Sequence, residues 1–531
     1  MPFEGFGKSI RAANAGKLPF HDLGGSIRKK LGSMKENKQM GPDLLFMLTY
    51  MASITTAQAT RPEIFEYTAT RKEYVPTRYI ERIEFFVKRW NYSYVQGLSI
   101  MADRVKNDML RSMLHRYANS IESGVPDEDF LNRELATIRS VYRNDYEQGL
   151  EMLKKWSDAY IAMLFSANLI GIIIMLSIAI FSPDDIQATL RSAYFIVLAI
   201  SVFGIITMYK SVPADDKTHS LERGSKEQSI IHRLEKKIIP IAIISAIVLY
   251  FFSQSTGLVM IFLGVLLLPL GIIGYFDDRN IVQRDAEFTM FIRSLGAVMG
   301  GKGITIASAL TEIDRKSMEY LEPFIAGVNS KLNLGLDEKL TWERFIGETG
   351  SNLIYKYLNI FRDSVELGGQ PDKIGAIVGS SMLEQVLLRE KRYSIAMGFI
   401  ILIIPMHAMM VGIFLFLYHI MLVMSKAIAT VVSSLGSSSS ALSSSTSVGG
   451  SIGGGLSLFV NFPEAEMGIF VLIMVSMVLI SNTIAAKIVM GGDRYMFYFF
   501  GGILLVLTGI VYISAPLIVD LFFSIPTFEA V

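Results

Sequence analysis

Long apolar runs alternate with polar segments along this chain, and the apolar runs have the length that crosses a membrane. A spanning helix needs about 20 mainly apolar residues, because each residue advances it by about 1.5 Å through a hydrocarbon layer about 30 Å thick. Seven segments reach or approach this length and predict seven spans. They are Tyr160–Phe181, Ser192–Met208, Ile238–Phe252, Gly257–Phe276, Ile395–Met424, Met467–Ala485 and Met496–Phe523.

The first long polar segment, which precedes the first span, contains an amphipathic helix. Its apolar residues recur at three- and four-residue steps behind Pro76-Thr77, and its charged residues occupy the opposite face. The apolar positions are Ile80, Ile83, Val87 and Trp90, and the charged positions are Glu81, Arg82, Glu84, Lys88 and Arg89. We therefore expect a helix whose apolar face enters a helical core.

The second long polar segment repeats features of the first. Phe46–Thr68 parallels Phe291–Glu312, and the residues that precede Gly124 parallel those that precede Gly368. The pair Gly368-Gly369 supplies the left-handed residue at which helices often end. We therefore predict a helical domain followed by membrane that occurs twice in the chain.

Positive charge is distributed very unevenly between the loops that join the seven spans. With the N-terminus inside the cell, 48 of the 50 lysines and arginines fall on the cytoplasmic side, and only Arg191 and Lys426 fall outside. Cytoplasmic loops of membrane proteins carry such an excess of Lys and Arg. The sequence therefore predicts a cytoplasmic N-terminus and an external C-terminus in the cell membrane.

The spans and the charge bias together predict an all-α integral membrane protein with two cytoplasmic helical-bundle domains. The predicted parts, in chain order, are a basic N-terminal arm (1–40), a first cytoplasmic helical domain (41–159), four spans with a basic cytoplasmic loop at 210–237 (160–276), a second cytoplasmic helical domain (277–394), a fifth span (395–424), an external Ser/Gly-rich loop (425–466), two last spans (467–523) and an external C-terminus (524–531).

The composition of two of these parts fits more than one role. The basic arm fits either a solvated segment or contact with anionic lipid head groups. The loop section Ser433–Gly455 is almost entirely Ser and Gly and predicts a flexible tether, with glycosylation of its hydroxyl groups as the alternative.

Residues that would support catalysis are scarce. The chain has no cysteine and six histidines, which excludes disulfides, thiolate metal sites and cysteine nucleophiles. One near-match to a nucleotide-binding loop, GAVMGGKG at 296–303, lacks the hydroxyl residue that binds magnesium and follows a helical segment instead of a strand. We interpret it as a flexible turn between helices, and we expect no enzymatic activity, no cofactor and no metal.

Polar residues within the spans are also few. They include His407 and His419 on the fifth span, Asn168 on the first and Asp520 near the end of the last. The two histidines are twelve residues apart and do not share a helix face, so they cannot chelate one ion together. A transporter would need several such groups around a cavity.

Clustered positive charge predicts a docking surface for a partner protein. Six basic residues lie on or just before the first amphipathic helix: Arg71, Lys72, Arg78, Arg82, Lys88 and Arg89. A second group, Arg389, Lys391 and Arg392, lies just before the fifth span, where it fits membrane anchoring as well as partner docking.

This layout resembles the platform proteins of type IV pilus and type II secretion machines, the F-domain family. The resemblance is carried by the two helical domains with their Phe46 and Phe291 helices and by the turns at Gly124 and Gly368. Bacterial members typically have three spans, whereas this chain has four between its domains and two more after the Ser/Gly loop. This departure and the stretch AAKIVMGGDRYMF at 485–497 resemble the archaeal branch of pilus and archaellum platforms.

The resemblance implies an assembly role without chemistry of its own. A platform lies beneath the filament, receives mechanical work from a hexameric cytoplasmic ATPase, and helps pilin or archaellin subunits move from the membrane into the filament. The expected partners are that ATPase, the subunits, other motor components, membrane lipids and a second copy of the chain, with no nucleic acid. The alternative from another class is a membrane transporter with large cytoplasmic domains.

Overall fold

The computed structural model describes residues 20–181, 186–221, 224–314, 316–438 and 463–523. In these residues every element of regular secondary structure is an α-helix. The β pairing there is limited to one antiparallel bridge between Thr218 and Ser351. The predicted all-α fold is therefore confirmed. The predicted flexible tether Ser433–Gly455 is helical at 433–438, and its remainder, with the alternative of glycosylation there, falls in 439–462, outside the described residues. Residues 1–19 and the C-terminus from 524 also lie outside the described residues.

The same order of helices occurs twice in the described chain. In each copy, four shorter helices stand between a helix that opens the domain and a long helix that follows it. The first set is α1 (Phe20–Thr55), α2 (Arg61–Ala69), α3 (Thr77–Trp90), α4 (Tyr94–Arg104), α5 (Asp108–Glu122) and α6 (Asp127–Phe181). The second set is α9 (Thr256–Lys302), α10 (Ile306–Glu312), α11 (Glu322–Asn333), α12 (Glu338–Thr349), α13 (Asn352–Glu366) and α14 (Pro371–Ser438). The remaining helices are α7 (Ile186–Ser211), α8 (Lys226–Ser253), α16 (Glu464–Met490) and α17 (Met496–Phe522).

Local sequence explains why the two sets match. Asn107 and Ser351 cap α5 and α13 by accepting the backbone N–H three residues further on, at 3.0 and 3.1 Å. Both helices end at a glycine with positive φ, Gly124 at +72° and Gly368 at +87°. The two caps and the two glycines stand at the same separation along the chain, and the predicted glycine stops are confirmed. The two sets of helices follow the order that the predicted repeat requires.

Contacts divide the described residues into two compact units. Unit 1 contains residues 20–47 and 65–124, and unit 2 contains residues 48–64 and the described residues from 125 to 523. In unit 1, Ile80, Ile83 and Phe86 of α3 are buried. The ring of Phe65 lies 4.7 Å from that of Tyr94 and stacks on Tyr117 at 5.7 Å. The predicted amphipathic helix is therefore confirmed as α3.

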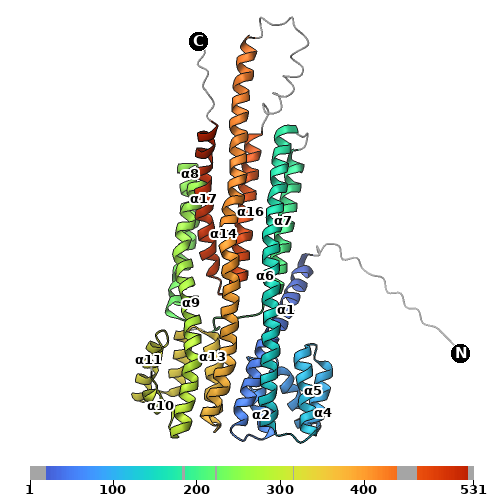
Figure 1. The fold of residues 1–531 in the computed structure, drawn as a ribbon, viewed down its shortest axis with the longest axis vertical. Helices are drawn as coiled ribbons and strands as arrows, with labels where there is room; N and C mark the ends of the chain where they lie inside the picture. The colour runs from blue at the N-terminus through green and yellow to red at the C-terminus, as the bar shows by residue number, and fades with distance from the viewer. Residues whose placement is uncertain (1–19, 182–185, 222–223, 315, 439–462, 524–531) are drawn as a thin grey trace, which may run out of the picture. The chain divides into compact units, whose positions relative to one another are not determined.

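Unit 2 contains the membrane helices. Seven of its helices, α6, α7, α8, α9, α14, α16 and α17, are long and apolar enough to cross a membrane, which confirms the predicted multi-pass membrane protein with seven spans. Figure 1 shows these helices running roughly parallel. The adjacent spans α8 and α9 are separated at Gln254, whose φ is +48°. Helices α6, α9 and α14 continue without a break from their polar segments into the spans.

Glycines spaced seven residues apart bring α9 and α17 into close contact. Gly264 faces the Gly502 carbonyl, and a Cβ atom at Gly264 would lie 2.8 Å from that oxygen. A Cβ at Gly271 would lie 2.3 Å from the Phe499 Cα, and one at Gly509 would lie 2.6 Å from the Gly257 oxygen. Small residues allow this approach between membrane helices, where van der Waals packing takes over from the hydrophobic effect.

Candidate functional site

The first predicted docking group lies on the surface of unit 1. Lys72, Arg78, Arg82, Lys88 and Arg89 are exposed, and Arg71 is half-buried. The Lys88 ammonium lies 3.1 Å from Glu66 and 3.2 Å from Glu84, and the Glu66 hydrogen bond raises the pKa of Lys88. Arg78 pairs with Glu36 and lies over its own neighbour Tyr79. The structure thus makes this group accessible, and its role in docking remains a prediction.

Exposed aromatic rings extend the same surface. Trp90 is 59% exposed and Phe85 50% exposed, and their ring centroids lie 6.0 Å apart. The prediction that Trp90 lies on the buried face of α3 is therefore wrong: Phe86 takes that place, and the helix ends at Asn91 with a left-handed φ of 56°. Periodicity misplaced Trp90 because it stands in the last turn, where the core no longer covers the helix. We call these exposed basic and aromatic residues of 71–92 the α3 surface.

The second predicted group divides into one exposed and two buried residues. Lys391 is half-exposed and lies 2.9 Å from Glu147. Arg389 and Arg392 are buried, with exposures of 6% and 4%. In this structure their charges are directed to groups of the same chain, so neither membrane anchoring nor partner docking describes these two arginines. Only Lys391 of this group presents its charge to solvent.

Arg389 joins three parts of unit 2. Its guanidinium donates to Asp215, in the connection between α7 and α8, and to Asp285 of α9, each with a shortest N···O distance of 2.6 Å. Asp285 also accepts a hydrogen bond from Ser351, at the N-terminus of α13. In the same connection, Lys217 pairs with Asp278 of α9 at 2.7 Å. Charged hydrogen bonds therefore fix the α7–α8 connection to both long helices.

The carboxylates of this cluster have unequal proton affinities. Burial alone would raise the pKa of Asp215, but the Arg389 guanidinium outweighs it and lowers that pKa. Burial raises the pKa of Asp285 to about 6, even though Arg389 and Ser351 act in the opposite direction. Burial likewise raises the pKa of Asp277 to about 6, against hydrogen bonds from Ser225 and Gln228. Each of these groups is hydrogen-bonded within the chain, to Arg389 or to Ser225 and Gln228.

Arg392 caps the end of a membrane helix. Its guanidinium donates to the carbonyl oxygens of Ile488 and Val489, at 3.1 and 3.4 Å, in the last turn of α16. Helix C-termini leave such carbonyls unpaired and attract cations. Gly491, at φ +76°, ends α16 directly against this guanidinium. The stretch 485–497 that carries the archaeal resemblance thus holds the contact between α16 and α14.

Within the spans, polar side chains form one directed hydrogen-bond chain across four helices. Tyr160 of α6 donates to Asn482 of α16 at 3.1 Å, and Asn482 donates to His407 of α14 at 3.0 Å. His407 Nε2 donates to Thr508 of α17 at 2.8 Å, and Thr508 donates to the Leu504 carbonyl at 2.7 Å. Every member is buried, and each bond has one donor and one acceptor. His419 instead bonds the Leu415 carbonyl of its own helix.

The near-match to a nucleotide-binding loop is part of a helix. Residues 296–302 belong to α9, which ends at Gly303 with φ +65°, so the prediction that 296–303 forms a turn is wrong. A Cβ at Gly296 would lie 2.3 Å from the Pro371 oxygen, and one at Gly300 would lie 2.8 Å from the Asp372 Cβ. These glycines therefore allow α9 to approach α14, and the Lys302 ammonium pairs with Glu312.

Comparison with known proteins gives two archaeal relatives. The chain is 24% identical over 392 residues to the Flagella accessory protein J of Methanococcus voltae, a match that covers 71% of this chain and 70% of that protein. It is 21% identical over 375 residues to the Flagella accessory protein J of Methanocaldococcus jannaschii, covering 67% and 66%. No family model and no solved structure matches the chain. The relatives confirm the predicted archaeal resemblance.

Proposed function

We propose that this FlaJ-like chain is the membrane platform of an archaellum or related pilus-like filament, with an accessory role in assembly and motility and no enzymatic activity of its own. Its relatives carry the name of flagella accessory proteins, and its seven apolar helices suit a multi-pass protein of the cell membrane. We place its N-terminus in the cytoplasm and its C-terminus outside, as the distribution of Lys and Arg favours.

The partner that does mechanical work is, in this proposal, a hexameric cytoplasmic ATPase that docks on the α3 surface. The observation that carries the proposal is the exposure of five basic residues and of Trp90 on or just before a helix whose apolar face is already buried. Trp and Arg are enriched at the centres of protein interfaces. An acidic surface on the ATPase would complement this surface and steer association.

Movement would then pass to the membrane through the continuous helices. Helices α9 and α14 extend for 47 and 68 residues from the second polar segment through the spans. Arg389 fixes them to the α7–α8 connection, and Arg392 fixes α14 to the end of α16. A push on the polar part of α14 would therefore displace several spans as a rigid body and help pilin-like subunits enter the filament. A homodimer of the chain is part of the same proposal.

Complementation tests the proposal directly. In cells that lack this gene, a variant with Arg82, Lys88 and Arg89 all changed to Glu should accumulate in the membrane at normal level but fail to assemble filaments. The matched control reverses Arg104 and Lys106, which are also exposed in unit 1 but are not part of the α3 surface. Normal filaments in the triple variant would contradict docking on the α3 surface. Solute uptake into vesicles that contain only this protein would favour the transporter alternative.

A further inference from the structure

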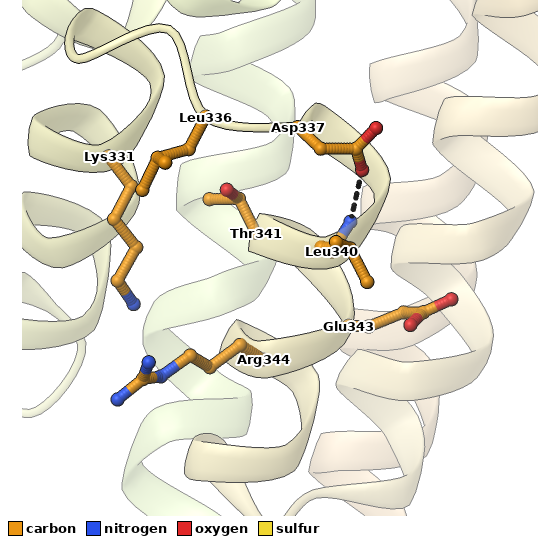
Figure 2. A pocket seen from close by; sticks show the side chains of 7 residues that line it. All are labelled: Lys331, Leu336, Asp337, Leu340, Thr341, Glu343 and Arg344. Atoms are coloured by element: carbon orange, nitrogen blue, oxygen red, sulfur yellow. Dashed lines mark hydrogen bonds between the residues drawn. The ribbon is translucent and has the colours of Figure 1, made fainter.

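A hollow on the second polar segment exposes leucines that the fold does not use. It has a volume of about 480 Å³ and lies at the turn between α11 and α12. Figure 2 shows Leu336 and Leu340 among the side chains that line it. Leu340 is 67% exposed and Leu336 54%, and Leu334 of the same turn is 78% exposed. Exposed apolar groups that lie together, and not singly, mark sites of interaction.

The local structure of the turn shows why Leu336 stays exposed in the part of the chain that the structure describes. Gly335, at φ +73°, donates to the Leu332 carbonyl, and Leu336 donates to the Lys331 carbonyl, at 2.9 and 3.1 Å. This is the Schellman pattern, in which the residue at the position of Leu336 usually packs on an apolar residue at the position of Lys331. Here that position holds a lysine. The turn therefore forms with its usual hydrogen bonds, and Leu336 remains uncovered.

Charge around the hollow is divided between two sides. In Figure 2 the charged ends of Lys331 and Arg344 lie on one side, and those of Asp337 and Glu343 on the other. Asp337 is occupied as the cap of α12, where it accepts from the Leu340 N–H at 2.8 Å. Arg344 pairs with the half-buried Glu348 at 2.7 Å, whereas Lys331 makes no ion pair within the described chain. A carboxylate placed beside Lys331 and Arg344 would meet two cations.

We propose that this leucine hollow, made of Leu336 and Leu340 with Lys331 and Arg344, docks an aliphatic segment of a partner protein that carries a carboxylate at one edge. The inference rests on the proposed function only in that this partner belongs to the same machine. It adds a second protein site, on unit 2, separate from the α3 surface of unit 1. Exposed leucines supply the contact area, and the two cations set the orientation.

A membrane surface fits the hollow less well than a protein does. Asp337, Glu338 and Glu343 are exposed around the leucines, and anionic head groups of the cytoplasmic leaflet would repel these carboxylates. A protein segment can instead place its own polar groups opposite both signs of charge. We therefore treat lipid and a second copy of this chain as the competing outcomes of the test.

The absence of cysteine makes the hollow accessible to a clean labelling experiment. Leu340→Cys is the probe, and Lys339→Cys, its exposed neighbour on α12, is the control. The rate of reaction with a water-soluble maleimide is measured on open membrane fragments from cells with the complete machine and from cells that make only this protein. The proposal predicts several-fold slower labelling of Leu340→Cys in the complete machine and equal rates for Lys339→Cys.

Charge variants then test the chemistry of the occupant. Changing Lys331 and Arg344 together to Glu should restore fast labelling of Leu340→Cys, whereas exchanging them for Arg and Lys should keep it slow. Equal rates with and without the machine would overturn the proposal. Slow labelling of the purified chain in lipid vesicles would also overturn it, in favour of lipid or a second copy.

The same measurement separates this site from the α3 surface. With Arg82, Lys88 and Arg89 reversed to Glu, filaments should be lost but Leu340→Cys should remain protected. Loss of protection in that variant would overturn the second site and leave the proposed function standing. If that variant forms normal filaments and its Leu340→Cys is still labelled slowly, docking on the α3 surface is contradicted and docking at the leucine hollow is supported.

Discussion

Replacement of Arg389 by methionine should weaken the fold more than any change of a neighbouring surface charge. The Arg389 side chain is 4% exposed and contacts Asp215 and Asp285, whose side chains are 9% and 1% exposed. Methionine fills similar space but leaves two buried carboxylates without their cation. Removing one partner of a buried ion pair costs about 3–5 kcal/mol. That is a large part of a typical folding free energy of about 5–15 kcal/mol.

The matched control lies two residues away. Lys391 pairs with Glu147 at 2.9 Å, but its side chain is 50% exposed, so Lys391→Met should cost no more than about 1 kcal/mol. Adding Asp285→Asn to Arg389→Met removes one of the two uncompensated charges and should restore part of the stability. The assay is the free energy of unfolding in mixed detergent micelles, measured for the four proteins at one pH.

A loss of stability in Arg389→Met no larger than that in Lys391→Met would contradict this prediction. That result would mean that solvent reaches Asp215 and Asp285 in the native protein, and that the α7–α8 connection is not fixed by charge. If Arg389→Met loses much stability and the added Asp285→Asn restores none of it, the loss comes from the unpaired Asp215 alone.

Three further changes test other parts of the structure. Gly271→Ala should lower the unfolding temperature in detergent, because the added Cβ would lie 2.3 Å from the Phe499 Cα and overpacking costs about 1–3 kcal/mol. The control is Gly398→Ala, whose added Cβ would have no neighbouring side chain or helix within 4 Å. Asp277→Asn should flatten the dependence of stability on pH between about 4 and 6, since the folded chain, with a pKa of about 6 at Asp277, holds a proton that the unfolded chain loses near pH 3.9. In the wild type, the contribution of Asp277 to the free energy of unfolding is therefore present at low pH and lost as the pH rises through about 6. An unchanged slope of unfolding free energy against pH in Asp277→Asn would contradict this prediction. Lys226→Cys should react with an impermeant maleimide only after lysis and Ser440→Cys on intact cells, whereas labelling of Lys226→Cys on intact cells would reverse the proposed orientation.

Features that depend on neighbouring residues were predictable from the sequence. The seven spans follow from local hydropathy, α3 follows from its periodicity, and Gly124 and Gly368 end their helices because positive φ suits glycine. The repeat also emerged from local similarity. Each of these properties is decided within one helix or one turn.

Features that depend on distant residues were not predictable. Arg389 looks like a surface charge in a run of basic residues, and its partners Asp215 and Asp285 are 174 and 104 positions away. Gly296 looks like part of a phosphate-binding loop, and only the crossing of α9 and α14 at Pro371 shows its packing role. The heptad spacing of Gly257, Gly264 and Gly271 was visible in the sequence and could have indicated the α9–α17 contact.

Binding of the machine's ATPase to the full-length chain across a salt series tests the central claim most directly. If the α3 surface is the docking site, affinity should fall as salt rises, because exposed charges are screened beyond about 8 Å at physiological ionic strength. Reversal of Arg82, Lys88 and Arg89 to Glu should abolish most of that salt dependence and slow association more than it speeds dissociation. The control reversal of Arg104 and Lys106 should bind like the wild type. Unchanged affinity of the triple variant at every salt concentration would contradict the account.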